Sequence, residues 1–482
     1  MERQSNLTIL QLNDTHAYLE PHQEMFWESG TTKYRRAGGF AKIAGYLKQL
    51  RHEKQDAVLA LDCGDTFHGT YPAVASKGEV MVPVLNELGL AAMTAHWEFA
   101  YGPEQFRKLT AILNYPMLAI NVYNKATDKL VFEPYTLKEI NGLKIGVIGI
   151  ACNIVDKTMP PHFSEGIYFT LGNEELPGYI QKLKQKEKVD LIVLISHLGF
   201  PQNMKLLSEV EGVDICLSSH THYRTSKAVK QGQTIVIESG CHGSFLGLLD
   251  LTLENGRISN FKHELVEVSD KLPDDAHMQE LVQQAVQPYQ EELSQIVGET
   301  ATVLNRNNIL ESTMDNFLLQ SMLHATGAEL AFSNGWRYGA PIVPGPVTLN
   351  DLYNIIPMNP PIQTVELTGQ ELQDILEENL EKTFSPDPYA QQGGFVKRCL
   401  GLRAFVKIEA PEGNRIQKLF VNDEKLGLQR TYKAAFVTEQ GVPQKYGANR
   451  ADAGIKAIEA MKQYLEKHSP VRADLLGTFT AV

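Results

Sequence analysis

Short apolar, β-branched runs alternate with amphipathic stretches along the first half of the chain. The apolar runs cover residues 7–12, 57–61, 191–195 and 213–217, each bounded by polar or glycine positions. Helical periodicity appears at 41–50, 103–112 and 179–188. This alternation is typical of βαβ units and predicts an α/β fold. Further strands at 144–150, 235–238 and 246–252, joined by short turns, indicate a mixed sheet or two packed sheets.

The pattern changes character near residue 270. A turn-like segment at 271–275 leads into a Gln- and Glu-rich helical stretch, which is typical of a linker. Beyond it, helical periodicity at 314–325, 367–382 and 451–467 indicates a second α/β region. A length of 482 residues exceeds what one hydrophobic core usually supports. We therefore predict a first domain at 1–268, a linker helix at 269–297 and a second domain at 298–482.

Composition and charge narrow the classes of partner. With 43% hydrophobic and 21% charged residues the chain is typical of a globular protein. A net charge of −12 argues against a nucleic-acid partner. No run approaches the roughly 20 apolar residues of a membrane helix, so no membrane partner is expected. A small anionic substrate remains compatible with this surface if metal ions supply positive charge locally.

The cysteines and the amino terminus bear on location. Five scattered cysteines without C-x-x-C spacing argue against a disulfide framework. The first residues show no basic segment followed by an apolar one, as an export signal would. A cytoplasmic location is therefore expected for the sequence as it stands, and a periplasmic or extracellular one if it is a mature form.

Five clusters of metal-binding residue types punctuate the first half, most of them directly after a predicted strand. Because parallel strands end at one edge of a sheet, such side chains can converge there. Any single Asp or His at such a position is more often a cap or a turn residue, but five clusters together favour a metal site. Aspartate and histidine bind Mn²⁺, Zn²⁺ or Fe²⁺, and paired ions activate water for hydrolysis of phosphate or sulfate derivatives. The clusters are Asn13-Asp14-Thr15-His16, Gly64-Asp65, His96-Trp97-Glu98-Phe99, Ser196-His197 and His220-Thr221-His222.

These motifs resemble the dinuclear metallophosphoesterases, and in particular the 5'-nucleotidase family of the bifunctional UDP-sugar hydrolase and 5'-nucleotidase type. N-D-x-H, G-D and H-x-H occur in the family's order. In the second half, residues 331–337 are similar to its N-G-G-G-I-R loop, and 367–372 match its L-T-G-x-E-L helix start. The resemblance implies an N-terminal four-layer α/β/β/α sandwich followed by a C-terminal α/β domain of the 5'-nucleotidase type.

The resemblance also implies a ligand set for two divalent ions, with manganese expected and zinc or iron as alternatives. Asp65 would bridge the ions, and His96 stands where the family has a ligating Asn. Asp65 and His96 are therefore the expected catalytic residues. The first ion would be held by Asp14, His16 and His222, and the second by His197 and His220.

The third cluster departs from the family pattern. Most nucleotidases read G-N-H-E-F-D, in which the His, oriented by the Asp, supports the leaving group. This chain has Trp97 and Ala100 at those two positions. Losing both partners together points to a changed mechanism, although Trp97 as a plain filler of the pocket wall is compatible with that view. H-W-E-F, together with Q-Q-G-G at 391–394, is similar to the thiosulfohydrolases of the bacterial sulfur-oxidising system.

For the second domain the resemblance implies that polar loops and two aromatic rings bind the substrate. Asn334 and Arg337 lie in the matched loop, and Phe395 stands where the first ring is expected. Tyr446 is either the second ring or an ordinary loop tyrosine. For Arg398 we expect a surface arginine.

Three functions follow from these observations. The leading one is a two-metal hydrolase of a phosphate ester or anhydride, with a nucleotide-like substrate and a role in nucleotide catabolism. The alternative removes sulfate or sulfonate from a thiol-linked substrate, and only then is a carrier-protein thiol a partner. The third is a binding protein that retains metal ions without turnover, and the otherwise complete ligand set argues against it.

Overall fold

The computed structural model describes residues 4–482 and divides into two compact units. One unit runs to Glu24, resumes at Arg35 and ends at Pro288, and the other comprises Met25–Tyr34 and Tyr289–Val482. The change of unit at Pro288 falls inside helix α8 (Ala276–Leu293), within the predicted linker. The sequence did not predict that Met25–Tyr34, in the hairpin of β2 (His22–Glu28) and β3 (Thr31–Ala37), groups with the C-terminal unit.

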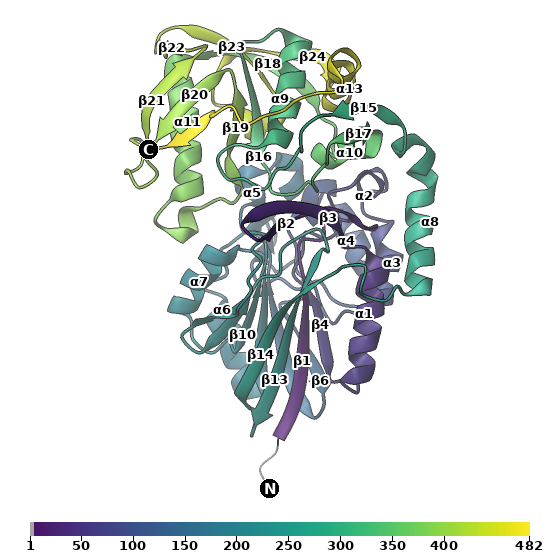
Figure 1. Ribbon diagram of the computed structural model, residues 1–482. Coiled ribbons are helices and arrows are strands. Elements are labelled where there is room, and N and C mark those ends of the chain that lie inside the picture. The colour runs from purple at the N-terminus through teal and green to yellow at the C-terminus, as the bar shows by residue number, and fades with distance from the viewer. Residues whose placement is uncertain (1–3) are drawn as a thin grey trace. The chain divides into compact units, whose positions relative to one another are not determined.

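Two mixed sheets form the centre of the N-terminal unit (Figure 1). The first has the order β14-β13-β1-β4, in which β1 and β4 run parallel. The second has the order β11-β12-β10-β9-β7-β6, and its four central strands are parallel. Their bounds are β1 (Gln4–Leu12), β4 (Val58–Asp62), β6 (Tyr135–Ile140), β7 (Leu143–Ile150), β9 (Leu191–Ser196), β10 (Ile215–Ser218), β11 (Val229–Gln231), β12 (Thr234–Ile237), β13 (Phe245–Glu254) and β14 (Arg257–Glu267).

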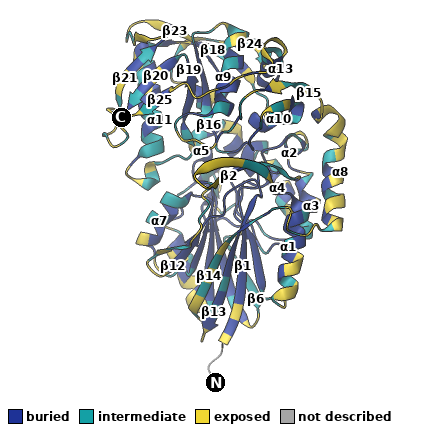
Figure 2. Ribbon diagram, in the orientation of Figure 1, coloured by how far each residue is buried: buried dark blue, intermediate teal, exposed yellow. Residues whose placement is uncertain are grey.

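The two sheets pack face to face. Alternate residues of each strand point to one side of a sheet, and those of both sheets meet in one core that includes Ile9, Leu61 and Val193. The intervening positions of the second sheet, such as Ile148 and Leu194, pack instead against helices. Figure 2 shows β1 and β13 as buried along most of their length, whereas β14, at the edge of its sheet, is largely intermediate or exposed.

Helices cover the outer faces of both sheets. On the second sheet these are α6 (Leu176–Gln181), which continues as the π-helical η3 (Lys182–Glu187), and α7 (Phe200–Glu209). On the first sheet, α1 (Phe40–Glu53) runs into Lys54, whose Nζ lies 2.8 Å from Asp250 on the outer face of β13. The expected four-layer α/β/β/α sandwich is therefore confirmed. The remaining elements of this unit are α2 (Tyr71–Ala75), α3 (Met81–Leu88), η1 (Trp97–Tyr101), α4 (Pro103–Ala111), β5 (Val122–Asn124), α5 (Val155–Thr158), η2 (Pro161–Ser164) and β8 (Ile167–Phe169).

The C-terminal unit is also α/β, as expected. Its main sheet has the order β19-β16-β23-β18-β24 and packs against helix α11 (Gly369–Phe384). The L-T-G-x-E-L motif begins this helix, because Thr368 and Glu371 form a reciprocal capping box. The strands are β15 (Ile296–Thr300), β16 (Leu330–Gly335), β17 (Gly345–Thr348), β18 (Pro361–Thr368), β19 (Phe395–Leu400), β20 (Leu402–Val406), β21 (Ile416–Val421), β22 (Glu424–Lys425), β23 (Thr431–Phe436), β24 (Ala448–Lys456) and β25 (Phe479–Ala481). The helices are α9 (Thr313–Thr326), α10 (Leu349–Ile355), η4 (Pro388–Ala390), α12 (Thr438–Gly441) and α13 (Ala457–His468).

One predicted helix is wrong over its first third. The sequence predicts a helix at 451–467, whereas strand β24 continues to Lys456 and α13 begins only at Ala457. The small residues of β24 carry no alternating apolar signal, and pairing with β18 decides their conformation. Among residues 4–482, no helix is both long and apolar enough to cross a bilayer.

Candidate metal centre

Loops that follow neighbouring strands bring the predicted ligands together. Asp14 and His16 follow β1, and Asp65 follows the parallel strand β4. Backbone hydrogen bonds join these two loops, since the amides of Asp14 and His16 donate to the carbonyls of Gly64 and Asp65 over 2.9 and 2.7 Å. His197 follows β9 in the second sheet. The expectation that strand ends deliver these side chains to one place is therefore met.

The ligand atoms form two groups that share one carboxylate. Within each group all ligand atoms lie within 4.8 Å of one another. Asp65 is common to both groups, as a bridging ligand would be. The first group is Asp14, His16, Asp65 and His222, and the second is Asp65, His96, His197 and His220.

Individual distances show how closely these atoms converge. In the first group, Nε2 of His16 lies 3.2 Å from Nε2 of His222. Nε2 of His222 lies 3.4 Å from Oδ1 of Asp14. In the second group, Nε2 of His197 and Nδ1 of His96 each lie 3.2 Å from an Asp65 oxygen. Such spacing matches the edges of a coordination shell with bonds of about 2.0–2.2 Å.

Backbone carbonyls fix the orientation of two imidazoles. Nδ1 of His16 lies 3.1 Å from the carbonyl oxygen of His68, and Nδ1 of His197 lies 2.6 Å from that of Cys63. A ring that donates Nδ1–H to a carbonyl presents the lone pair of Nε2 to the opposite side, which is the usual outer support of a metal-binding histidine. The buried Nε2 of His197 has no aligned hydrogen-bond donor among residues 4–482. This donor set fits divalent cations.

The backbone at the site is strained. Left-handed φ angles are rare for residues other than glycine and cost roughly 1 kcal/mol each or more. Five of the seven ligand residues adopt them, and such strain persists where the surrounding structure holds it and commonly marks functional sites. These residues are Asp14, His16, Asp65, His220 and His222, with φ between 48° and 81°.

The charges at the site act differently on the carboxylates and the imidazoles. Burial alone would raise the pKa of Asp14, but His222 and His197 outweigh it and hold that pKa below the usual value. Burial would also raise the pKa of Asp65, but His96 and His197 outweigh it and hold that pKa well below the usual value. Burial lowers the pKa of His16 to about 3. At neutral pH the carboxylates are thus ionised and His16 is neutral, as coordination requires. Although burial opposes it, the Asp65 carboxylate raises the pKa of His197 to about 10, so a bound ion would have to displace a proton there.

The altered third cluster forms an aromatic wall. The Trp97 ring stacks on His68 with centroids 4.7 Å apart and an interplanar angle of 19°, and meets Phe163 edge-on at 6.0 Å. The Trp97 amide donates to Asp65 over 2.7 Å. The Glu98 carboxylate accepts 2.6 Å hydrogen bonds from the amides of His96 and Thr66. No role was assigned to Glu98 from the sequence, although it belongs to the third cluster, and His68, which lies three residues after Asp65, was not singled out.

Three of the four predicted substrate residues lie on adjoining segments of the C-terminal unit. Asn334 is on β16, Arg337 follows it, and Phe395 begins the paired strand β19. The Arg337 guanidinium lies 5.6 Å from the Phe395 ring centroid. Tyr446 packs at the edge of the core, and its hydroxyl donates to Glu378 over 3.1 Å.

The prediction that Arg398 lies at the surface is wrong. The Arg398 side chain is buried, and its Nε lies 3.0 Å from Oδ2 of Asp315. Asp315 also binds the buried Arg306, with Nη2 2.9 Å from Oδ1. The sequence could not reveal this because Asp315 and Arg398 lie 83 residues apart along the chain.

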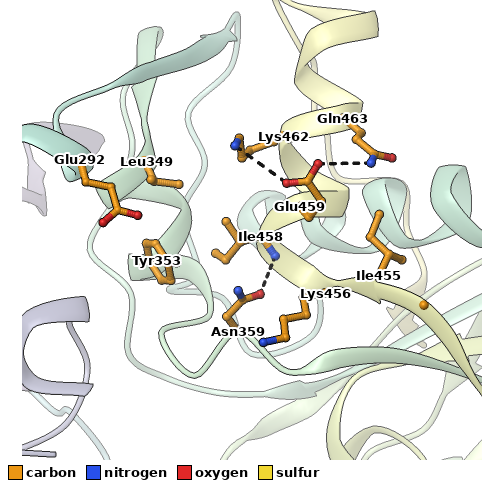
Figure 3. Close-up of a pocket in the computed structure, with 11 residues that line it drawn as sticks. Glu292, Leu349, Tyr353, Asn359, Ile455, Lys456, Ile458, Glu459, Lys462 and Gln463 are labelled. Atoms are coloured by element: carbon orange, nitrogen blue, oxygen red, sulfur yellow. Dashed lines mark hydrogen bonds and ion pairs between the residues drawn. The ribbon is translucent and has the colours of Figure 1, made fainter. Parts of the chain in front are cut away.

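A separate pocket of about 480 Å³ in the C-terminal unit contains none of the predicted site residues (Figure 3). Its polar groups on α13 pair with one another. Glu459 accepts from Gln463 over 3.3 Å and lies 3.9 Å from Lys462, while Asn359 accepts from the amide of Ile458 over 3.0 Å. We assign no ligand to this pocket.

Each of the two units contains a segment that matches a known protein family. Residues 7–224 match the model for calcineurin-like phosphoesterases, and residues 294–438 match that for the 5'-nucleotidase C-terminal domain. A 5'-nucleotidase of Vibrio cholerae is 24% identical over 96% of this chain and 91% of its own length. The trifunctional nucleotide phosphoesterase protein YfkN of Bacillus subtilis is 24% identical over 89% of this chain, which spans only 31% of that longer protein.

Solved structures agree over almost the whole chain. A 5'-nucleotidase precursor from Thermus thermophilus is 25% identical, with a TM-score of 0.87 over 99% of each chain. The sulfate thiohydrolase SoxB from the same organism is 24% identical, with a TM-score of 0.92 over 99% of this chain and 96% of its own. At that identity the likeness to SoxB shows the fold alone. The chain is therefore a 5'-nucleotidase-like metallophosphoesterase, built from a calcineurin-like phosphoesterase domain and a 5'-nucleotidase C-terminal domain.

Proposed function

We propose that this metallophosphoesterase hydrolyses nucleotide-like phosphoanhydrides in preference to simple phosphate esters. Two bound divalent ions, for which we propose Mn²⁺, would supply the positive charge that activates water and stabilises the developing negative charge. The chain contributes Asp65 between the two ligand groups, His96 beside it, and imidazoles held by carbonyls. We further propose that Asn334, Arg337, Phe395 and Tyr446 bind the organic part of the substrate.

The proposed preference rests on the aromatic wall that Trp97 forms with His68 and Phe163. Where related nucleotidases have an imidazole that supports the leaving group, this chain has an indole stacked on His68. Ala100 supplies no carboxylate either. An alkoxide leaving group benefits from a donated proton by typically 10²- to 10⁴-fold, whereas phosphate and thiolate groups leave as weaker bases. Without the dyad, hydrolysis should favour substrates with such leaving groups.

The same reasoning supports a second candidate. A thiolate is also a leaving group of low basicity, so a sulfonate linked to a thiol would suit this site. H-W-E-F at 96–99 and Q-Q-G-G at 391–394 favour it. Under this candidate a carrier-protein thiol would be the partner.

A panel of substrates distinguishes these candidates. Purified protein loaded with Mn²⁺ would be assayed for kcat/KM on an aryl phosphate, AMP, ADP, a nucleotide sugar and an S-sulfonated cysteine peptide. We expect kcat/KM for ADP and the nucleotide sugar to exceed that for AMP by about 10²-fold or more, the lower end of the range for a missing proton donor. Highest turnover of the S-sulfonated peptide would establish the second candidate instead. Highest turnover of AMP would contradict the preference itself.

Variants at the wall link the preference to its cause. Replacing Trp97→His together with Ala100→Asp should raise the ratio of AMP to ADP turnover. Trp97→Phe is the matched control, because it retains an aromatic ring but supplies no exchangeable proton, and should leave this ratio unchanged. Equal ratios in the double variant and the control would show that the wall does not set the preference.

A further inference from the structure

A third group of metal-binding side chains lies beside the two-ion centre. His22 and Glu24 are two residues apart on β2 and therefore project to the same side of the strand. His242 reaches them from the loop between β12 and β13. One ligand atom from each of the three lies within 4.8 Å of the other two. We propose that His22, Glu24 and His242 form a mononuclear site for a first-row divalent cation such as Zn²⁺.

The hydrogen bonds of His22 are those of a metal-binding histidine. Its Nδ1 lies 3.1 Å from the carbonyl oxygen of Glu20, so that Nδ1–H donates outward and the lone pair is on Nε2. His16 and His197 in the two-ion centre have the same arrangement. Nε2 of His22 lies 3.1 Å from Oγ of Ser244, and a bound ion would replace this hydroxyl as the partner of the lone pair. Gly38 backs the ring, since a Cβ at that position would come within 2.7 Å of Cε1 of His22. The ring of His22 is thus held in place.

Glu24 would supply one carboxylate oxygen to the ion, while its other oxygen accepts a hydrogen bond from the protein. Oε1 accepts a 2.8 Å hydrogen bond from Nη2 of Arg224, and Oε2 lies 3.2 Å from Nδ1 of His242. A ligating carboxylate commonly has such an outer partner. The 3.2 Å separation also matches the edge between a nitrogen and an oxygen ligand at about 2.0–2.2 Å from one ion. Two imidazoles and one carboxylate suit Zn²⁺ or Fe²⁺ and leave coordination positions open.

His242 has the strained backbone found at the two-ion centre. Its φ is 59°, and its amide donates to the carbonyl of Asp14 over 2.7 Å. Its ring centroid lies 6.1 Å from that of His16 and 6.2 Å from that of His222. The proposed site is therefore a neighbour of the two-ion centre that shares no ligand with it.

The charges predict an order of affinity. One carboxylate serves the proposed site, and Arg224 already neutralises part of its charge. Asp14 and Asp65 serve the two-ion centre. The third ion should accordingly bind more weakly than the first two and leave first when a chelator is added.

Metal titration tests the site without reference to activity. Protein stripped with a chelator would be titrated with Zn²⁺, and bound zinc counted by elemental analysis after gel filtration. We expect three equivalents in the wild type, with the third the weakest, and two in Glu24→Gln. Glu20→Gln is the matched control, because the exposed side chain of Glu20 contributes no ligand and only its carbonyl supports His22. It should retain three equivalents.

Diffraction from wild-type crystals grown with Zn²⁺ provides a second measurement that does not depend on folding of a variant. An anomalous peak within about 2.0–2.2 Å of ligand atoms of His22, Glu24 and His242 is expected. Two equivalents in the wild type, three in Glu24→Gln, or no peak at the cluster would each overturn the proposal.

Discussion

Replacing Asp65→Asn should remove bound metal and hydrolytic activity together. Asp65 is the one carboxylate common to both ligand groups, so its loss removes a negative charge from each ion at once. The amide oxygen of Asn can still accept the 2.7 Å hydrogen bond from the Trp97 amide, which preserves the loop. We expect kcat/KM to fall by about 10²- to 10³-fold or more, the range for removing one group that stabilises the transition state electrostatically.

The measurements are metal content by elemental analysis and kcat/KM on the best substrate of the panel. Asp56→Asn provides the matched control, because Asp56 is exposed and outside the ligand groups. A circular-dichroism melt of both variants separates loss of metal from loss of fold. Full activity with undiminished metal content in Asp65→Asn would exclude a bridging role.

The largest expected effect on stability is at Asp315. This buried carboxylate neutralises two buried guanidinium groups, with Arg306 Nη2 at 2.9 Å and Arg398 Nε at 3.0 Å. Ser312 Oγ donates to it over 2.6 Å and also caps α9. Asp315→Ala leaves two positive charges without a counter-ion in the interior. We expect urea denaturation to show that the free energy of unfolding falls by about 3–5 kcal/mol, as it does when one partner of a buried ion pair is removed.

Asp374→Ala is the control for this loss. Asp374 is exposed on α11 and, within residues 4–482, accepts only a 2.8 Å hydrogen bond from Gln370. A surface change of this kind shifts the free energy of unfolding by about 0.5 kcal/mol or less. Equal stability of the two variants would show that the arginine network does not stabilise the C-terminal unit.

The convergence of most candidate ligands could be predicted because they follow recognisable strands, whereas His96 was singled out through the family resemblance. Asp14, Asp65 and His197 come directly after apolar runs, and parallel pairing brings the ends of such runs together. The four-layer sandwich followed from the family resemblance. Periodicity alone indicated a mixed sheet or two packed sheets.

Other features depend on contacts that no local pattern encodes. The sequence predicts helix for residues 451–456 because the small residues of β24 fit either conformation until β18 pairs with them. β2 carries mixed polar and aromatic residues, so neither the hairpin nor the approach of Glu24 to His242 could be foreseen. Arg398 was misplaced because its burial depends on Asp315, which the sequence gives no reason to pair with it.

Crystallography of the Mn²⁺-loaded protein, with anomalous data collected at the manganese edge, tests the central claim most directly. The account predicts two peaks about 3.5–4 Å apart, the spacing of two-metal hydrolytic sites. Asp65 should lie between them, with Asp14, His16 and His222 around one and His96, His197 and His220 around the other. A single peak, or two peaks that do not share Asp65, would contradict it.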